Sequence, residues 1–163
     1  AQEYAEKGVE GIVLDLRGNS GGLLSASVDI AGLWLDNQVV VEQRGNQQGE
    51  LRSGSRGELF GVPTVVLING GSASASEIVA GALQDHGAAT LIGETTFGKG
   101  SVQSLEELTG GAQLKVTIAR WFKPKGKKID KKGIAPDQEV NLTNEDFEND
   151  LNPQLEAALK TLR

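Results

Sequence analysis

The chain has 163 residues, enough for one domain that buries roughly 70% of the surface exposed by its unfolded form. Its 38% hydrophobic and 23% charged content lies in the globular range, and apolar runs such as residues 65–68 are too short to span a bilayer. The net charge of −6 argues against nucleic acid as a partner, the absence of cysteine excludes thiol catalysis, and a single histidine excludes a His-rich metal site.

The first part of the chain predicts a strand, a glycine turn and a helix. Residues 11–16, Gly-Ile-Val-Leu-Asp-Leu, are typical of a buried strand. The turn Arg17-Gly-Asn-Ser-Gly-Gly22 follows, and apolar side chains at helical spacing then indicate a helix over about 23–35. We expect another strand at 39–43 and a polar, Gly-rich surface excursion at 44–61.

The same order of elements occurs a second time. A buried strand at 64–68 leads into the turn Asn69-Gly-Gly-Ser-Ala-Ser74 and a helix over 75–83. The other expected elements are a short strand at 90–92, alternating strand material through 113–119, and a last helix capped by Asn152 with Pro153 at its first position. This order predicts one α/β domain, with a sheet flanked by helices.

Ser74 stands between the second glycine turn and its helix, and two interpretations are open. With Glu77 three residues later, it fits a capping box that satisfies the backbone donors of the helix start. It also fits a nucleophile, because the next N–H, from Ala75, points to where an oxyanion would form. The only histidine, His86, would lie about three helical turns, roughly 18 Å, from Ser74. This separation argues against a Ser-His-Asp triad, and we expect His86 on the surface near a helix end.

Lys99 is the lysine that lies among small and apolar neighbours, in Phe97-Gly-Lys-Gly-Ser-Val102. A lysine acts as a general base only if desolvation or a nearby cation lowers its pKa from about 10.4 toward neutrality. In an extended chain Gln103 would share a face with Lys99 and could orient its ammonium group. A solvated loop lysine is the alternative. A P-loop is a poor match, because Gly100 stands where Ser or Thr should bind magnesium and no amphipathic helix is expected to follow.

Residues 120–132 hold seven cationic side chains and one carboxylate, a net of +6, so the remainder of the chain carries −12. We expect a solvated hairpin here rather than a nucleic-acid surface, because Pro124 and Gly126 interrupt the run and the acidic remainder repels a polyanion. The acidic stretch at 145–150 lacks the spacing and glycine of a calcium loop, so no metal is expected.

Four segments together resemble one family, the carboxyl-terminal processing peptidases, or tail-specific proteases, which are serine peptidases with a Ser/Lys dyad. The resemblance runs from about residue 8 to 140. Its motifs are Gly11-Ile-Val-Leu-Asp-Leu-Arg-Gly-Asn-Ser-Gly-Gly22, Gly71-Ser-Ala-Ser-Ala-Ser-Glu77, Gly93-Glu-Thr-Thr-Phe-Gly-Lys-Gly-Ser-Val-Gln103 and Gly133-Ile-Ala-Pro-Asp137. Four motifs in this order and spacing make the match specific.

The resemblance implies roles for individual residues. Ser74 corresponds to the nucleophile, Lys99 to the general base 25 residues later, and Gln103 to the residue that orients that lysine. It implies an oxyanion hole made by the N–H of Ala75 and that of Gly22 or Gly21. It also implies acyl transfer with no metal and no cofactor.

The resemblance further implies a crotonase- and Clp-protease-like ββα core, with polypeptide substrates that have free apolar C-termini. We expect residues 1–163 to be the peptidase core of a larger parent, without the upstream PDZ domain that family members usually carry. The implied setting is extracytoplasmic: bacterial periplasm, cell envelope or thylakoid lumen. A non-catalytic peptide-docking module and a crotonase-type acyl-CoA enzyme are the alternative functions on this fold.

Overall fold

The computed structural model describes residues 2–46 and 48–163, and its centre is a four-stranded parallel sheet. Each neighbouring pair of strands is parallel, and β1 and β4 align Ile12 with Thr64. The strand order is β1 (Ile12–Asp15), β4 (Thr64–Ile68), β5 (Thr90–Gly93) and β8 (Gln138–Glu139).

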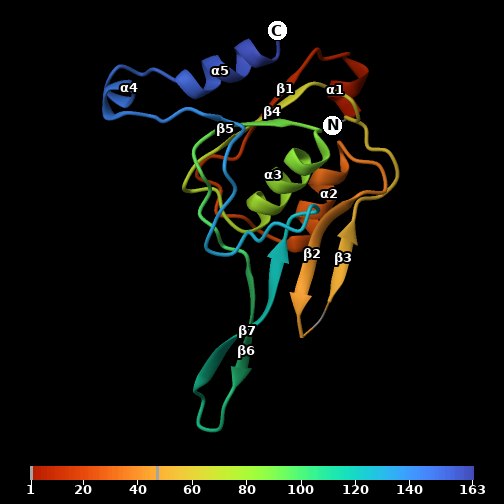
Figure 1. The fold of residues 1–163 in the computed structure, drawn as a ribbon, viewed down its shortest axis with the longest axis vertical. Helices are drawn as coiled ribbons and strands as arrows, with labels where there is room; N and C mark the ends of the chain where they lie inside the picture. The colour runs from red at the N-terminus through yellow and green to blue at the C-terminus, as the bar shows by residue number, and fades with distance from the viewer. Residues whose placement is uncertain (1, 47) are drawn as a thin grey trace.

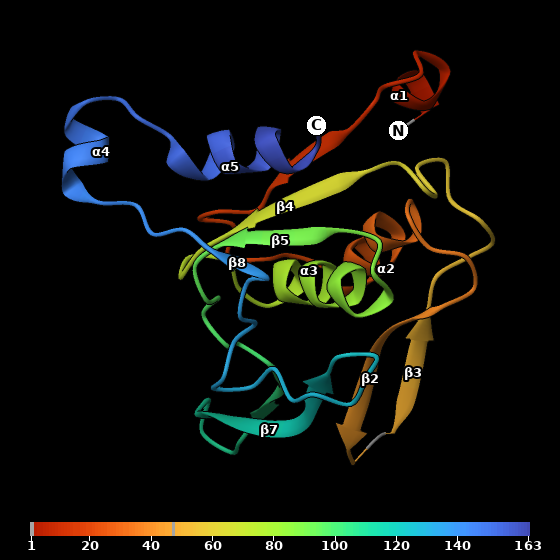
Figure 2. The same ribbon diagram turned by 45° about the horizontal axis from the view of Figure 1, so that its top comes forward.

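Both faces of this sheet are covered, which explains why residues 65–68 of β4 are all apolar. Figure 2 shows α2 (Leu24–Gly32) and α3 (Ala75–His86) on one side and α5 (Pro153–Thr161) on the other. All five residues of β4 are buried. Successive side chains of a strand point to opposite faces, so Val66 and Ile68 pack in the cluster that includes α2 and α3, whereas Val65 and Leu67 pack with Ala158 of α5.

A second sheet is entirely antiparallel and lies beyond α2 and α3 from the first. Its β6–β7 hairpin extends away from the helices, toward the bottom of Figure 1. The register of this hairpin shifts between Val102 and Gln103, near its base. The strand order is β3 (Gly49–Arg52), β2 (Val39–Gly45), β7 (Gln113–Phe122) and β6 (Ser101–Glu107).

The α/β class, both units of strand, glycine turn and helix, and the Asn152-capped last helix are confirmed. The sequence did not predict β3, β8, α1 (Gln2–Glu6) or α4 (Asn144–Glu148). β3 falls within the segment predicted as a surface excursion; it is an edge strand that is mostly exposed, so it lacks the apolar alternation that identifies a strand. Among the described residues, no helix is both long enough and apolar enough to cross a bilayer.

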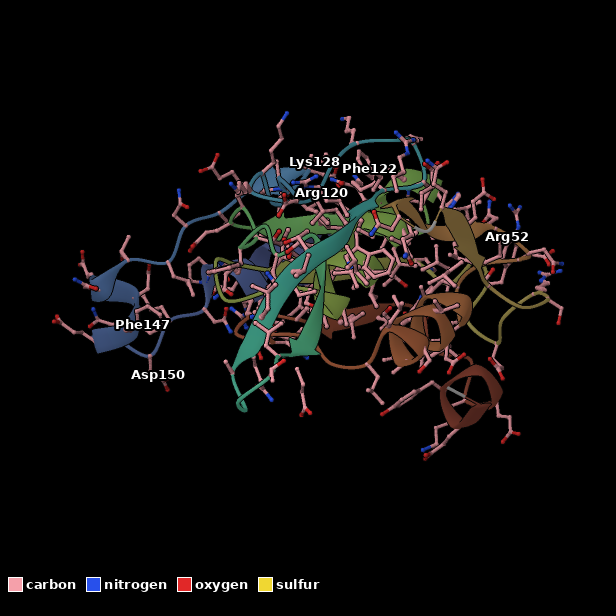
Figure 3. The ribbon with its side chains drawn as sticks, turned by 90° about the horizontal axis from the view of Figure 1, so that it is seen from below. Arg52, Arg120, Phe122, Lys128, Phe147 and Asp150 are labelled. Carbon is pink, nitrogen blue, oxygen red and sulfur yellow. The ribbon has the colours of Figure 1, made fainter. Side chains whose placement is uncertain are left out.

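The basic segment 120–132 forms a hairpin, but the prediction that it is solvated is wrong for Lys123. The Nζ of Lys123 lies 2.7 Å from Oδ1 of Asp85, and the two side chains are only 8% and 5% exposed. Asp85 belongs to α3, so a counter-charge distant in sequence permits the burial. Arg120 and Lys128, which Figure 3 shows close together, both lie near Oδ2 of Asp130, at 3.2 and 3.4 Å.

Candidate active site

The two glycine turns lie side by side, because each follows a strand of the same parallel sheet and β1 neighbours β4. The Oδ1 of Asn69 accepts hydrogen bonds from the N–H of Gly18 (2.9 Å) and the N–H of Gly71 (3.0 Å). The N–H of Ala73 donates to the carbonyl of Asn19 (3.0 Å). These bonds fix one turn against the other at the carboxyl ends of the strands, where α/β sheets commonly bind ligands.

Ser74 is the N-cap of α3 and has a backbone conformation that side-chain-bearing residues seldom adopt, with φ 56° and ψ −118°. Its N–H donates to Oε2 of Glu77 (2.9 Å), and the two residues form the reciprocal arrangement of a capping box. In this arrangement the Ser74 hydroxyl faces the N–H of Glu77 but does not form a hydrogen bond with it. Backbone strain of this kind costs about 1–3 kcal/mol and is concentrated at functional sites.

Gly21 lies directly against Ser74 and requires the absence of a side chain. Its φ is +101°, and a Cβ there would come within 2.7 Å of the Ala73 carbonyl oxygen and 2.9 Å of the Ala75 nitrogen. The N–H of Gly21 donates to Oδ1 of Asn19 (2.9 Å), so this donor is already used. Gly22 has no such partner among the described residues, which makes its N–H the better oxyanion donor of the two predicted.

A pocket of 150 Å³ brings the predicted nucleophile and oxyanion donors together: Ser74, Ala75 and Gly22 all line it. The other lining residues are Leu24, Ile78, Ser101, Val102 and Trp121. As the first residue of α3, Ala75 has an N–H without a partner in the helix. The pocket is therefore lined by the serine and by both residues whose N–H groups are the predicted oxyanion donors.

A larger cavity of 400 Å³ adjoins this pocket and shares Gly22 and Ala75 with it. Much of its lining is aliphatic and includes Leu23, Ile30 and Val79. Leu23 is 74% exposed and Ile30 is 43% exposed, although both are apolar. The surface beside Ser74 is therefore suited to an apolar side chain of a bound molecule.

Glu77 does more than the capping box that the sequence predicted. Its side chain is fully buried and accepts four hydrogen bonds. Oε1 accepts from the hydroxyl of Thr96 (2.5 Å) and the N–H of Gly98 (2.7 Å), while Oε2 accepts from the N–H groups of Ser74 and Lys99 (2.9 and 2.8 Å). These donors match the acceptor capacity of an ionised carboxylate. Glu77 thereby connects the start of α3 to the loop that carries Lys99.

The structure holds Lys99 beside the Ser74 turn through its backbone, but its side chain is exposed. Of the two interpretations that the sequence left open, the exposure is that of a solvated loop lysine: Phe97 is itself 68% exposed, and the apolar neighbours in sequence do not bury the side chain. Among the described residues, no hydrogen bond joins Ser74 Oγ to Lys99 Nζ. The loop leads into β6 at Ser101 and not into a helix, which agrees with the rejection of a P-loop.

Gln103 lies on β6 and is exposed. Lys99 precedes β6, so the alternation of a strand does not extend to it, and the described hydrogen bonds include none between the two side chains. His86 is the last residue of α3, as predicted, but it is half-buried rather than free on the surface, with Nε2 2.7 Å from the carbonyl of Val39.

Arg17 has an importance that the sequence did not show. Its guanidinium binds both carboxylate oxygens of Asp15, through Nε (2.9 Å) and Nη2 (2.7 Å). The hydrogen bonds from Arg17 lower the pKa of Asp15, and those to Asp15 raise the pKa of Arg17. The Nη1 of Arg17 contacts Asn152 and Gln154, which lie far along the sequence. No local spacing could reveal these contacts.

Comparison with known proteins agrees with the motifs. The model of peptidase family S41 matches residues 1–140. A "Carboxyl-terminal-processing protease" of Synechocystis is 47% identical over 98% of this chain, and "Carboxyl-terminal-processing peptidase 3, chloroplastic" of Arabidopsis thaliana is 46% identical over 83%. The chain spans 38% and 27% of the lengths of these two relatives.

A solved structure titled "Photosystem II D1 C-terminal processing protease" superposes with a TM-score of 0.81 at 39% identity, covering 86% of this chain and 37% of that one. This similarity agrees with the predicted crotonase- and Clp-protease-like core. The tricorn protease, at 23% identity and a TM-score of 0.67, shares the fold. By sequence and by structure, the chain belongs to peptidase family S41, among relatives named carboxyl-terminal-processing proteases.

Proposed function

We propose that the protein is a serine endopeptidase in which Ser74 is the nucleophile and Lys99 the general base. The observation that carries the proposal is the pocket that Ser74 shares with Ala75 and Gly22. It places a serine with a strained backbone beside the two residues whose N–H groups would act as donors, which is the arrangement that acyl transfer requires. Gln103 orients the lysine in this proposal.

The reaction proceeds in two halves. Neutral Lys99 takes the proton of the Ser74 hydroxyl while Oγ attacks the peptide carbonyl, and the N–H groups of Ala75 and Gly22 stabilise the oxyanion. As the C–N bond breaks, the lysine gives its proton to the departing amine. Water then attacks the ester carbonyl, with Lys99 again as base, and releases the free serine and the new carboxylate.

Because Lys99 is exposed, the bound substrate itself must remove water from the lysine side chain. A lysine is neutral near pH 7 only when water is removed from its ammonium group or another cation is nearby. Glu77 fixes the backbone of Lys99 next to that of Ser74, through Oε2. A polypeptide lying across the pocket would cover the lysine side chain and exclude water as it binds.

We also propose that the substrates are polypeptides with free, apolar C-termini. The aliphatic cavity beside Ser74 supports this proposal. Its residues Leu23 and Ile30 form an exposed apolar surface on which an apolar side chain of the substrate would pack. A PDZ domain of the whole protein would capture the tail. The setting is extracytoplasmic, in bacterial periplasm, cell envelope or thylakoid lumen, and the work is quality control or the maturation of a precursor.

The test is mass spectrometry of an unfolded substrate with an apolar free C-terminus, after incubation with the whole protein and its Lys99→Ala and Ser74→Ala variants. Cleavage by the wild type alone is expected. The Lys127→Ala variant, which alters another exposed lysine, should cleave normally. Substrate binding without cleavage by the wild type would favour a docking module. Turnover by Lys99→Ala would contradict the Ser/Lys dyad. The crotonase-type alternative would then be tested with an acyl-CoA substrate.

A further inference from the structure

The guanidinium of Arg17 joins the first glycine turn to the start of α5. Its Nη1 donates to Oδ1 of Asn152 (3.0 Å) and to Oε1 of Gln154 (2.9 Å), while Nε and Nη2 hold Asp15. Arg17 thus uses four hydrogen bonds in one plane, and its side chain is only 18% exposed. A side chain held in this way fixes the position of its own backbone.

The two acceptors on α5 are themselves held in place. Gln154 is fully buried, and its amide nitrogen donates to the carbonyl of Val140 (2.7 Å), so its oxygen must face Arg17. Asn152 is the N-cap of α5, with Oδ1 accepting also from the N–H of Leu155 (3.2 Å). Both residues lie beyond residue 140, where the match to the family model ends.

A continuous series of contacts leads from Arg17 to Ser74. The next residue, Gly18, is bound to Asn69, and the carbonyl of Asn19 accepts from Ala73, the neighbour of Ser74. The side chain of Asn19 holds the N–H of Gly21, which precedes the proposed oxyanion donor Gly22. The position of Arg17 therefore affects the geometry of that donor.

We propose that Gln154, supported by Asn152, is a positioning residue for the oxyanion hole, acting through Arg17. The inference rests on the proposed peptidase function. The acceptors at the start of α5 hold the guanidinium, and through it the turn that carries Gly22, which lines the pocket shared with Ser74. In the absence of these acceptors, Arg17 keeps its pair with Asp15 at the end of β1 but loses its hydrogen bonds to the start of α5.

General docking of α5 can be separated from this role. The helix packs on the sheet through Ala158 and its C-cap residue Leu162, which join the apolar cluster of Val65, Leu67 and Ile92. Neither residue is a hydrogen-bond partner of Arg17. Leu162→Ala weakens the docking and leaves the acceptors intact. Gln154→Leu removes the acceptor at nearly constant volume, while Gln154→Glu keeps an oxygen for Arg17 and loses the donor to Val140.

The experiment measures three quantities on the whole protein and these three variants: kcat and KM for a peptide substrate, the rate at which a fluorophosphonate labels Ser74, and deuterium uptake of the backbone at residues 17–22. Gln154→Leu should lower kcat and the labelling rate about 10- to 100-fold, the range of a small misplacement of catalytic groups, with KM nearly unchanged. Uptake at 17–22 should rise. Gln154→Glu and Leu162→Ala should each stay within about threefold of wild-type kcat.

The outcomes separate the two proposals. Unchanged uptake at 17–22 in Gln154→Leu overturns the positioning role, whatever the activity. Equal losses of kcat in Gln154→Leu and Leu162→Ala also overturn it, because docking of α5 would then suffice as the explanation. Absence of Ser74 labelling in the wild type overturns the peptidase function, while the uptake measurement still decides whether α5 holds the turn.

Discussion

The backbone N–H of Lys99 lies 2.8 Å from Oε2 of Glu77, a fully buried carboxylate on the first turn of α3. The same oxygen accepts the N–H of Ser74. One side chain thus holds the backbones of the two residues that we propose as nucleophile and base, although they are 25 positions apart. The relative position of the pair depends on this carboxylate rather than on a direct contact between their side chains.

Glu77→Gln is therefore expected to reduce both stability and activity. An amide nitrogen on either side of the group would face N–H donors that now reach an acceptor, and an unsatisfied buried polar group costs about 1–3 kcal/mol. Urea denaturation should show a loss of that size, and kcat should fall more than KM rises. A variant with wild-type stability and kcat would contradict the connecting role of Glu77.

Substitution by alanine should affect the two adjacent glycines of the first turn, Gly21 and Gly22, differently. Gly21→Ala places a Cβ within 3 Å of backbone atoms at Ala73 and Ala75, at a φ of +101°, so it should destabilise the fold and inactivate the site. Gly22→Ala meets nothing within 4 Å and keeps its N–H, so its thermal unfolding should match the wild type. Equal melting temperatures for both variants would contradict this prediction, because they would show that the turn accommodates the Cβ at position 21 without loss of stability.

Removing one partner of the buried ion pair of Lys123 and Asp85 should cost far more stability than breaking an exposed pair. Asp85→Ala leaves an ammonium without its counter-charge in a buried position, which typically costs about 3–5 kcal/mol. Adding Lys123→Met should recover much of that loss. Lys7→Ala removes an exposed pair with Glu3 and should cost under about 1 kcal/mol. Chemical denaturation of these three variants beside the wild type measures each free-energy change.

Acid should weaken the fold partly through Asp15. Because Arg17 lowers the pKa of Asp15 below its ordinary value of 3.8, the unfolded chain binds protons more readily than the folded one in acid. The stabilisation is present above that value and is lost as the pH falls below it, toward the folded-state pKa. Asp15→Asn should be less stable at pH 7 and should lose less on acidification. Parallel stability curves from about pH 5 to 3 would refute this.

Local patterns predicted the parts of the site that lie within a few residues of one another. The turn at Gly21 and Gly22, the strained start of α3 at Ser74 and its capping partner Glu77 could all be inferred from short motifs. The sequence could not decide between a desolvated and an exposed Lys99, because apolar neighbours in sequence cover a side chain only if the loop folds over it. Here Phe97 points into solvent.

The contacts missed by sequence reasoning are the distant ones. Thr96 and Gly98 reach Glu77 across 19 and 21 residues, and β8 exists because two residues pair with β5, not because of their composition. Spacing identifies which residues share a helix face or strand face, but it does not show which loops meet. That information resides in the topology of the sheet.

The separation between Arg17 and Gln154, 137 residues, has a consequence for biosynthesis. During translation both glycine turns, the serine and the lysine leave the ribosome well before α5 does. If α5 anchors the first turn as we propose, a nascent chain holds every reacting group but lacks the contact that orders the oxyanion donor. Competence for proteolysis would then follow the docking of α5 on the sheet, so a chain that has not reached this fold would cleave poorly although it already carries its nucleophile and its base.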